Sequence, residues 1–314
     1  MESVLVQTFV KFNRRTPFLK NSRNNSFQSF IDAGLKNNLE VYLSRFDLYD
    51  PKRKLIRTAW AHKDRWEKVK DKSVDLVFYR GRNVDAKKIG KRITNLKMNL
   101  VNHPEIEQVC DDKIYTNMVF PEFTPKTFLI NDHNQLNQAL KYITTKKVVL
   151  KPRFGSYGKD VMVIDKSKLR NGITKNTLLQ EFIESSNGVS KINIKGRHDI
   201  RVMMIDGKID HCYARMPKRG HYLGNMEFGA SKRFFPKYKL PADILKKLSL
   251  IDKEFKLYKT RIYSADFLMD SNNKAWLIEL NSKPDTLHYE GEESLRDKYY
   301  FNICQSLKKS IKNI

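Results

Sequence analysis

The segment YSADFLMDSNNKAWLIELN, residues 263–281, constrains the fold of this 314-residue chain more than any other stretch. Two β-rich arms flank Asn272-Asn273, and asparagine tolerates the positive φ angles that a tight hairpin turn requires. A turn centred on this pair places Asp266 directly opposite Glu279, with Cβ atoms about 5 Å apart. Asn281 lies two residues beyond Glu279, so its side chain points to the same face of the hairpin.

Two carboxylates that face each other repel and destabilise a strand pair, unless a cation lies between them or they share a proton. Two carboxylates and an amide oxygen form a hard-oxygen set that suits Mg²⁺. The pattern therefore predicts a metal site at Asp266, Glu279 and Asn281, while Trp276, Ile278 and Leu280 are expected in the core. The alternative is a solvated carboxylate pair on an exposed hairpin.

A second constraint is the stretch KPRFGSYGKD, residues 151–160, which follows the apolar run VVL and precedes DVMVI. A Walker phosphate loop needs a first glycine, then Gly-Lys-Ser/Thr opening a helix. Arg153 stands in place of that glycine, Asp160 in place of the hydroxyl residue, and a strand follows instead of a helix. The Walker interpretation therefore fails.

A glycine-rich hairpin can nevertheless close over phosphates, because Gly155 and Gly158 let backbone N–H groups approach oxyanions closely. Lys151 on the preceding strand and Lys159 in the loop would add positive charge. An ordinary surface turn with lysines nearby remains the alternative.

The rest of the chain reads as an α+β protein. Strand-like and helical segments alternate over about the first 100 residues, which favours an open, largely parallel sheet. Asp206-Gly207 lies between two β-rich arms and predicts a second hairpin. Helices are expected over NDHNQLNQALKYI, which begins with Asn and Asp, over PADILKKLSLIDKEFKLY, and over the amphipathic C-terminal segment SLRDKYYFNICQSLKKSIKN.

The composition is that of a soluble globular protein, with 40% hydrophobic and 30% charged residues. No apolar run is long enough for a membrane helix, the N-terminus does not read as a signal peptide, and the three cysteines are widely separated. These features predict a cytoplasmic protein with no membrane partner. The net charge of +25 fits a nucleic-acid partner, an anionic substrate, nucleotide phosphates or an acidic polypeptide, but it forms no block of consecutive basic residues.

From about Leu76 to Asp285, the chain resembles the ATP-grasp superfamily, particularly carboxylate–amine ligases such as glutathione synthetase and RimK. It is also similar to the YheC/YheD-type proteins associated with spore coats. The resemblance rests on five segments in the expected order: DKIYTNMVF with TPKTF, VVLKPRFGSYGKDVMVI, LLQEFI, HDIRVMMIDGKI, and ADFLMD with WLIELNSKPDT.

The resemblance implies an ATP-grasp fold with an N-terminal α/β domain over residues 1–110. Two α+β subdomains, over residues 111–184 and 185–314, would grip ATP. The cofactors implied are ATP and Mg²⁺, with Mn²⁺ as an alternative ion. The reaction implied joins a carboxylate, either a small acid or an acidic peptide, to an amine through an acylphosphate, releasing ADP and phosphate.

The roles that the resemblance implies fall into four groups. The ATP-binding residues are Lys113, Lys151, Gly155, Ser156, Gly158, Lys159, Gln180, Glu181, Ile183 and Glu184, with Glu184 at the ribose. The residues near the transferred phosphate are Arg201, Arg215 and Lys151. The metal ligands are Asp266, Glu279 and Asn281. The substrate residues are Asn225 and, in the loop SKPDT, Lys283.

The chain departs from the family pattern after Arg215, where LGNMEFGAS stands in place of the usual glycine-rich stretch. This weakens the assignment of Asn225. Two other functions remain open from the sequence. One is a catalytically silent ATP-grasp protein with a structural role in a spore or assembly, and the other is a basic nucleic-acid-binding protein. The acid, the amine and the oligomeric state are not specified by the residues.

Overall fold

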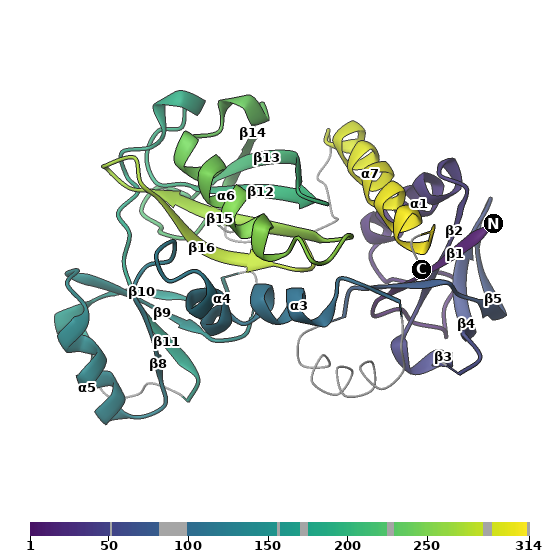
Figure 1. Ribbon diagram of the computed structural model, residues 1–314, viewed down its shortest axis with the longest axis horizontal. Helices are drawn as coiled ribbons and strands as arrows, with labels where there is room; N and C mark the ends of the chain where they lie inside the picture. The colour runs from purple at the N-terminus through teal and green to yellow at the C-terminus, as the bar shows by residue number, and fades with distance from the viewer. Residues whose placement is uncertain are drawn as a thin grey trace. The chain divides into compact units, whose positions relative to one another are not determined.

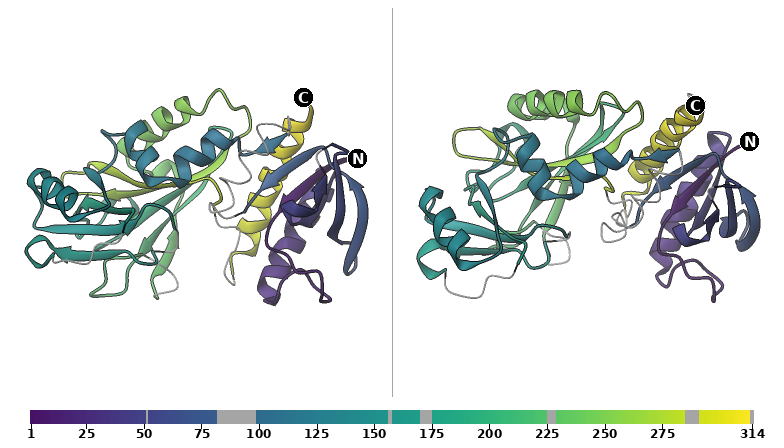
Figure 2. Two further views of the ribbon diagram at one scale, coloured as in Figure 1. Left: turned by 90° about the horizontal axis from the view of Figure 1, so that it is seen from below. Right: turned by 60° about the horizontal axis from the view of Figure 1, so that its bottom comes forward.

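The computed structural model describes residues 1–50, 52–81, 99–155, 158–169, 175–224, 229–284 and 291–312. The chain divides into two compact units (Figures 1 and 2). The N-terminal unit comprises Met1–Pro104, Tyr258–Ile262 and Lys283–Ile314, and the second unit comprises Glu105–Leu257 and Tyr263–Ser282. Among the described residues, no helix is both long and apolar enough to cross a bilayer.

The N-terminal unit is built on a seven-stranded sheet in the order β3-β4-β2-β1-β6-β7, with β5 paired to β4. Its strands are β1 (Glu2–Gln7), β2 (Leu39–Ser44), β3 (Tyr49–Asp50), β4 (Leu55–His62), β5 (Trp66–Ser73), β6 (Leu76–Tyr79) and β7 (Leu100–Val101). Strand β1 runs parallel to both β2 and β6, as the alternating pattern predicts. The antiparallel β4–β5 hairpin was not anticipated from the sequence.

Helices α1 (Asn21–Lys36) and α7 (Glu293–Lys312) pack together in this unit. Tyr300 of α7 lies edge-on to Phe30, with ring centroids 5.2 Å apart, and its hydroxyl shares a hydrogen bond with Ser26. The amphipathic C-terminal helix is therefore confirmed. The predicted boundaries at residues 110 and 184 remain a prediction, and the compact units group α7 with the N-terminal part of the chain.

The second unit contains a four-stranded antiparallel sheet and a five-stranded sheet (Figure 1). The four-stranded sheet has the order β10-β9-β11-β8, from β8 (Thr127–Ile130), β9 (Lys147–Pro152), β10 (Met162–Asp165) and β11 (Thr177–Glu181). The five-stranded sheet has the order β14-β13-β12-β15-β16, from β12 (Asp199–Ile205), β13 (Lys208–Met216), β14 (Ser231–Phe234), β15 (Ile262–Met269) and β16 (Ala275–Asn281). The helices are α3 (Pro104–Asp111), α4 (Lys113–Val119), α5 (His133–Tyr142) and α6 (Ala242–Glu254).

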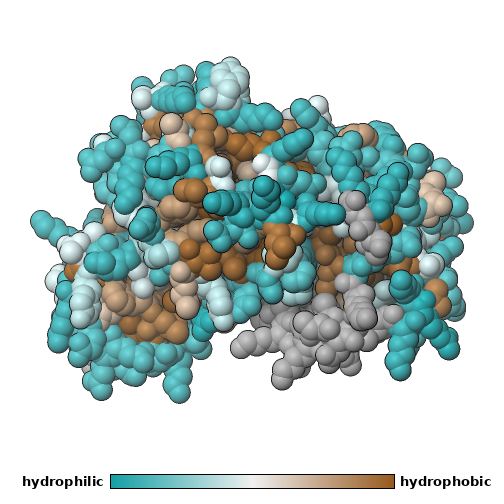
Figure 3. Space-filling model, in the orientation of Figure 1, coloured by the Kyte–Doolittle hydropathy of each residue, from teal (hydrophilic) through white to brown (hydrophobic). Residues whose placement is uncertain are grey.

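Local sequence signals account for several of these elements. Asp206 and Gly207 have φ angles of 50° and 81° and join β12 to β13, which confirms the predicted hairpin. The glycine loop joins the antiparallel pair β9 and β10, also as predicted. Hydrophobic and hydrophilic side chains intermingle on the face of the molecule in Figure 3, and the hydrophilic ones predominate.

The N-terminus of α5 provides a test of local stability. Asp132 caps this helix, and its Oδ1 accepts a hydrogen bond of 2.8 Å from the backbone N–H of Gln135. Replacing Asp132 with alanine should lower the free energy of unfolding by about 1 kcal/mol, because an N–H of the first turn loses its acceptor. Urea unfolding followed by circular dichroism measures this loss, and Asp132→Asn, which retains an acceptor, should keep most of the stability.

Candidate functional site

The hairpin formed by β15 and β16, which carries Asp266 and Glu279, has the predicted residue pairing but a different turn. Asp266 pairs with Glu279 and Ser264 with Asn281, so the predicted pairing is confirmed. The turn, however, is a longer connection over Asp270–Lys274, and a β-bulge lies between the Asp266 and Phe267 pairs. The predicted turn centred on Asn272-Asn273 is therefore wrong, and the bulge restores the pairing that the longer turn would otherwise shift by one residue.

The bulge also corrects the predicted core. Between the turn and the bulge, Leu277 pairs with Phe267, and both side chains are fully buried. Beyond the bulge, Leu280 is buried as expected. Trp276 and Ile278, which were expected in the core, are only partly buried, because one extra residue reverses the alternation of inward and outward side chains.

Arginines neutralise Asp266 from the neighbouring strands. Arg201 on β12 donates two hydrogen bonds to its carboxylate, at 2.7 and 2.6 Å, and Arg215 on β13 donates a third at 2.8 Å. Arg215 also donates to Asp199 at 2.6 Å. The strand order β13-β12-β15 brings these side chains together.

These contacts change the pKa values of the carboxylic acids in the cluster. Burial alone would raise the pKa of Asp266, but the charges and hydrogen bonds of Arg201 and Arg215 hold it below its usual value. Burial raises the pKa of Asp199 to about 6, assisted by the charge of Asp266 and opposed by Arg215. Asp266 is therefore an anion at neutral pH.

Lys113 connects Glu279 to the glycine loop. Its Nζ lies 3.1 Å from the Glu279 carboxylate and donates a 2.9 Å hydrogen bond to the carbonyl oxygen of Gly155. The preceding residue, Asp112, caps α4 and holds Arg153, at the base of the same loop, through a bidentate ion pair. Asp112 and Arg153 lie in segments that carry the resemblance, but they were not predicted as site residues, because their ion pair joins positions 41 residues apart.

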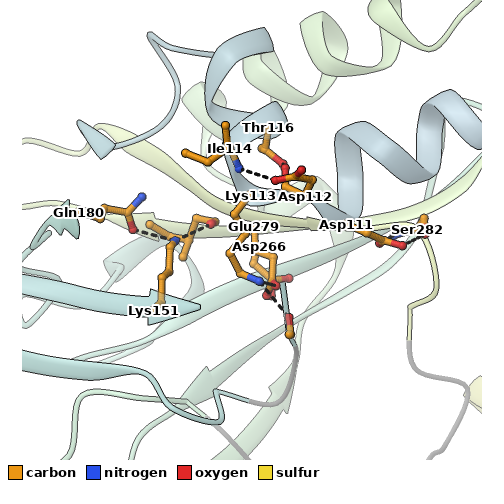
Figure 4. A network of polar contacts seen from close by, with 12 residues as sticks. Asp111, Asp112, Lys113, Ile114, Thr116, Lys151, Gln180, Asp266, Glu279 and Ser282 are labelled. Carbon is orange, nitrogen blue, oxygen red and sulfur yellow. Dashed lines mark hydrogen bonds and ion pairs between the residues drawn. The ribbon is translucent and has the colours of Figure 1, made fainter. Parts of the chain in front are cut away.

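Lys151 lies where the two sheets of the second unit meet (Figure 4). Its Nζ donates to Gln180 Oε1 at 2.9 Å and to the carbonyl oxygen of Ile278 at 3.4 Å. Gln180 is fixed in turn by Thr127, whose Oγ1 accepts from its side-chain amide at 2.7 Å. Burial, followed by the charge of Lys113, lowers the pKa of Lys151 to about 7.

The structure describes the remaining predicted ATP-binding residues apart from Ser156. Glu181 accepts hydrogen bonds from the backbone and hydroxyl of Thr144, both at 3.0 Å. Glu184 is half-exposed and pairs with Arg197 at 3.3 Å. Gly155 and Gly158 have positive φ angles of 139° and 63°, which the loop requires, and Lys159 is exposed. Ile183 lies just after the end of β11, between Glu181 and Glu184 in the sequence.

Three predicted site residues are not among the described residues of the second unit. Ser156 and Asn225 lie outside the described residues, as do Asp285 and Thr286 of the predicted substrate loop. Lys283 belongs to the N-terminal unit, where its Nζ lies 5.0 Å from the centroid of the Tyr79 ring.

The predicted metal ligands fit a hard divalent cation in their chemistry. Glu279 and Asn281 share a strand and a face, and the buried Nδ2 of Asn281 has no hydrogen-bond partner within the described part of the chain. An Oδ1–metal bond would leave that amide group free to donate to a ligand oxygen. Asp266 is held by two arginines, so a cation would compete with them there. No cluster of three His, Cys, Asp or Glu side chains lies among the described residues; the predicted set contains two carboxylates and an amide.

Comparison with known proteins identifies the fold and the family. The RimK-like ATP-grasp domain matches residues 120–295. Glutathione synthetase from Shewanella oneidensis is 27% identical over 133 residues, covering 42% of this chain and 41% of the relative. Glutathione synthetase from Buchnera aphidicola is 28% identical over 134 residues, covering 41% and 40%. Each match thus spans about two fifths of the relative.

Solved structures extend the likeness to the whole chain. D-alanine–D-alanine ligase from Bacillus anthracis, complexed with ATP, has a TM-score of 0.63 at 13% identity and covers 100% of this chain and 98% of its own. The ATP-grasp ligase PsnB, complexed with a minimal precursor, has a TM-score of 0.60 at 11% identity, covering 98% and 99%. The predicted α+β ATP-grasp fold is confirmed.

Proposed function

The chain belongs to the RimK-like ATP-grasp family, and from this premise we propose that it is an ATP-dependent ligase that forms an amide between a carboxylate and an amine. The observation that carries the proposal is the convergence of Lys113, Lys151 and Glu279 beside the Asp266–arginine cluster. The acid would be a small molecule or an acidic peptide.

The proposed reaction has two steps. A carboxylate oxygen of the acid attacks the γ-phosphorus of ATP, the bond to the bridging oxygen breaks, and ADP leaves with the electron pair. The nitrogen of the amine then attacks the acyl carbon, phosphate departs, and the nitrogen loses a proton. No side-chain nucleophile is required, so the protein contributes positioning and charge.

The side chains divide this work by their positions. Lys151 would bind phosphate oxygens, because a buried cation in a site of low dielectric interacts strongly with an anion. Arg201 and Arg215 would offset the negative charge that develops on the transferred group, with Asp266 and Asp199 holding their orientation. Glu279 and Asn281, with Asp266, would hold magnesium, which when bound would neutralise the β- and γ-phosphates.

The first test is Mg–ATP binding by calorimetry to the wild type and to Glu279→Ala, each with and without magnesium. We expect magnesium-dependent binding that weakens at least tenfold in the variant, since one carboxylate ligand and its contact with Lys113 are removed. Glu254→Ala, on α6, is the control and should bind normally. Absence of binding by the wild type would refute the proposal. Binding to nucleic acid, which the net charge of +25 also fits, would then be measured next.

ATP binding should also take up a proton above pH 7. The pKa of Lys151 is about 7 in the free protein, and a phosphate would raise it by favouring the charged amine. The affinity for ATP is then at its maximum below pH 7. Above pH 7 it falls by up to about tenfold per pH unit, until the pKa of Lys151 in the complex is reached. Calorimetry at pH 8.5 in buffers of different ionisation enthalpy measures the uptake, which should vanish in Lys151→Met. An enthalpy independent of buffer in the wild type would contradict the assignment.

A further inference from the structure

The loop after β13 contacts both sheets of the second unit. We call residues 217–224 of this connection the bridging loop, and its Gly224 lies against the Asp199–Arg215 pair. A Cβ atom at position 224 would lie 2.5 Å from Asp199 Oδ2 and 3.1 Å from Arg215 Cβ. Packing this close means that the loop cannot shift toward the pair without displacing it.

Two residues earlier, Tyr222 reaches the four-stranded sheet. Lys147 Nζ donates a 2.5 Å hydrogen bond to its hydroxyl, and the Phe182 ring lies edge-on with centroids 5.4 Å apart. The Arg197 guanidinium lies 4.5 Å from the centroid of the Tyr222 ring. A hydrogen bond, an aromatic contact and a cation–π contact thus hold this one side chain.

Tyr222 contacts Lys147, which lies at the opposite end of the β9 face that carries Lys151. Lys147 and Lys151 alternate onto the same face of β9, about 13 Å apart along the strand. Glu181 pairs with Val148, so Phe182 continues toward Lys147 beyond Gln180. Tyr222 therefore lies beside residues 181–184, away from the predicted phosphate end.

Arg197 leaves a polar group unsatisfied at this end. One of its nitrogens pairs with Glu184 at 3.3 Å, while its Nε is buried and has no hydrogen-bond partner within the described ranges. An unsatisfied buried donor costs free energy that an acceptor atom of a ligand would recover. A purine base or its ribose, unlike a bare phosphate chain, carries such acceptors to this end.

We propose that Tyr222 is a positioning residue that links occupation of the base end of the nucleotide site to the position of Arg215. The inference rests on the proposed ATP site and deepens it. A base that contacts Tyr222 and Arg197 fixes the bridging loop, and Gly224 then fixes the Asp199–Arg215 pair. Inorganic triphosphate reaches the lysines alone and adds no contact to the loop.

The test compares the dissociation constants of Mg–ATP and Mg–triphosphate by calorimetry. The wild type should bind ATP more tightly. Tyr222→Ala should weaken ATP binding roughly tenfold and change triphosphate binding by less than about twofold. Tyr222→Phe, which keeps the ring contacts, should retain most of the ATP affinity. His221→Ala, an exposed neighbour in the same loop, is the control and should match the wild type.

The link to Arg215 requires a double-mutant cycle. In an Arg215→Lys background, Tyr222→Ala should weaken ATP binding by less than about threefold, because the coupled partner is already altered. Equal losses in both backgrounds would overturn the coupling. Equal losses for ATP and triphosphate, or no loss for either, would overturn the role of Tyr222. Tyr222→Leu, which removes the ring but keeps an apolar side chain, decides the question if Tyr222→Ala does not fold. A wild type that binds neither ligand would overturn the proposed function itself.

Discussion

Replacing Asp266 with alanine should lower the free energy of unfolding of the second unit by about 3–5 kcal/mol. The carboxylate is almost completely buried, with 3% exposure, and accepts hydrogen bonds from both Arg201 and Arg215. Its removal leaves the largely buried Arg201 guanidinium without the carboxylate that pairs with it. Breaking a buried ion pair costs far more than the pair contributes at a surface, because the remaining charge has no access to water.

Chemical denaturation of the variant measures this loss, and Asp47→Ala provides the matched control. Asp47 accepts a comparable bidentate pair of hydrogen bonds from Arg45, but both side chains are about half-exposed. The control should cost at most about 1 kcal/mol, because solvent screens the pair and can hydrate the arginine left behind. Equal losses for the two variants would show that burial does not determine the energetics of the Asp266 cluster.

The second large effect should appear in affinity. Replacing Lys151 with methionine keeps a flexible side chain of similar length but removes the buried amine, and ATP should bind roughly 100-fold more weakly. Stability should stay constant or rise near pH 6, because the folded protein no longer has to keep a buried amine protonated. The opposite directions of these two effects separate a binding role from a structural one.

Calorimetry with Mg–ATP and thermal unfolding at pH 6 test this pair of expectations. Lys168→Met is the control, since Lys168 lies on the same part of the chain and its side chain is 74% exposed. The control should change neither quantity appreciably. Unchanged ATP affinity in Lys151→Met would remove this lysine from the phosphate site, whatever its effect on stability.

Local chemistry explains which elements could be predicted from the sequence. Asp206-Gly207 carries the turn geometry in its own residues, and Asp132 carries the cap of α5. The β4–β5 hairpin escaped prediction because β5 reads WEKVKDKS, in which exposed lysines obscure the strand pattern. The Asp266–Glu279 pairing was found, but the bulge that produces it has no marker in the sequence.

The residues proposed for the site could be named from the sequence, but the contacts that they make in the folded chain could not. Arg201 and Arg215 could be placed on one hairpin, but only the strand order sets β12 beside β15 and gives both arginines to Asp266. Asp112 and Arg153 lie 41 positions apart and meet only in the folded chain. Contacts of this kind depend on tertiary arrangement, which local patterns do not specify.

The β-bulge also determines which experiments can detect the hydrogen bond between Lys151 and the backbone of Ile278. Removing Ile278 altogether would leave Glu279 to follow Leu277 directly and still face Asp266, so the extra residue is not needed for the carboxylate pairing. It supplies the carbonyl oxygen that accepts from Lys151. An alanine scan would retain that oxygen at every position and record Ile278 as dispensable. Only shortening the backbone at this residue, or exchanging its amide link for an ester to weaken the acceptor, would expose what this residue contributes.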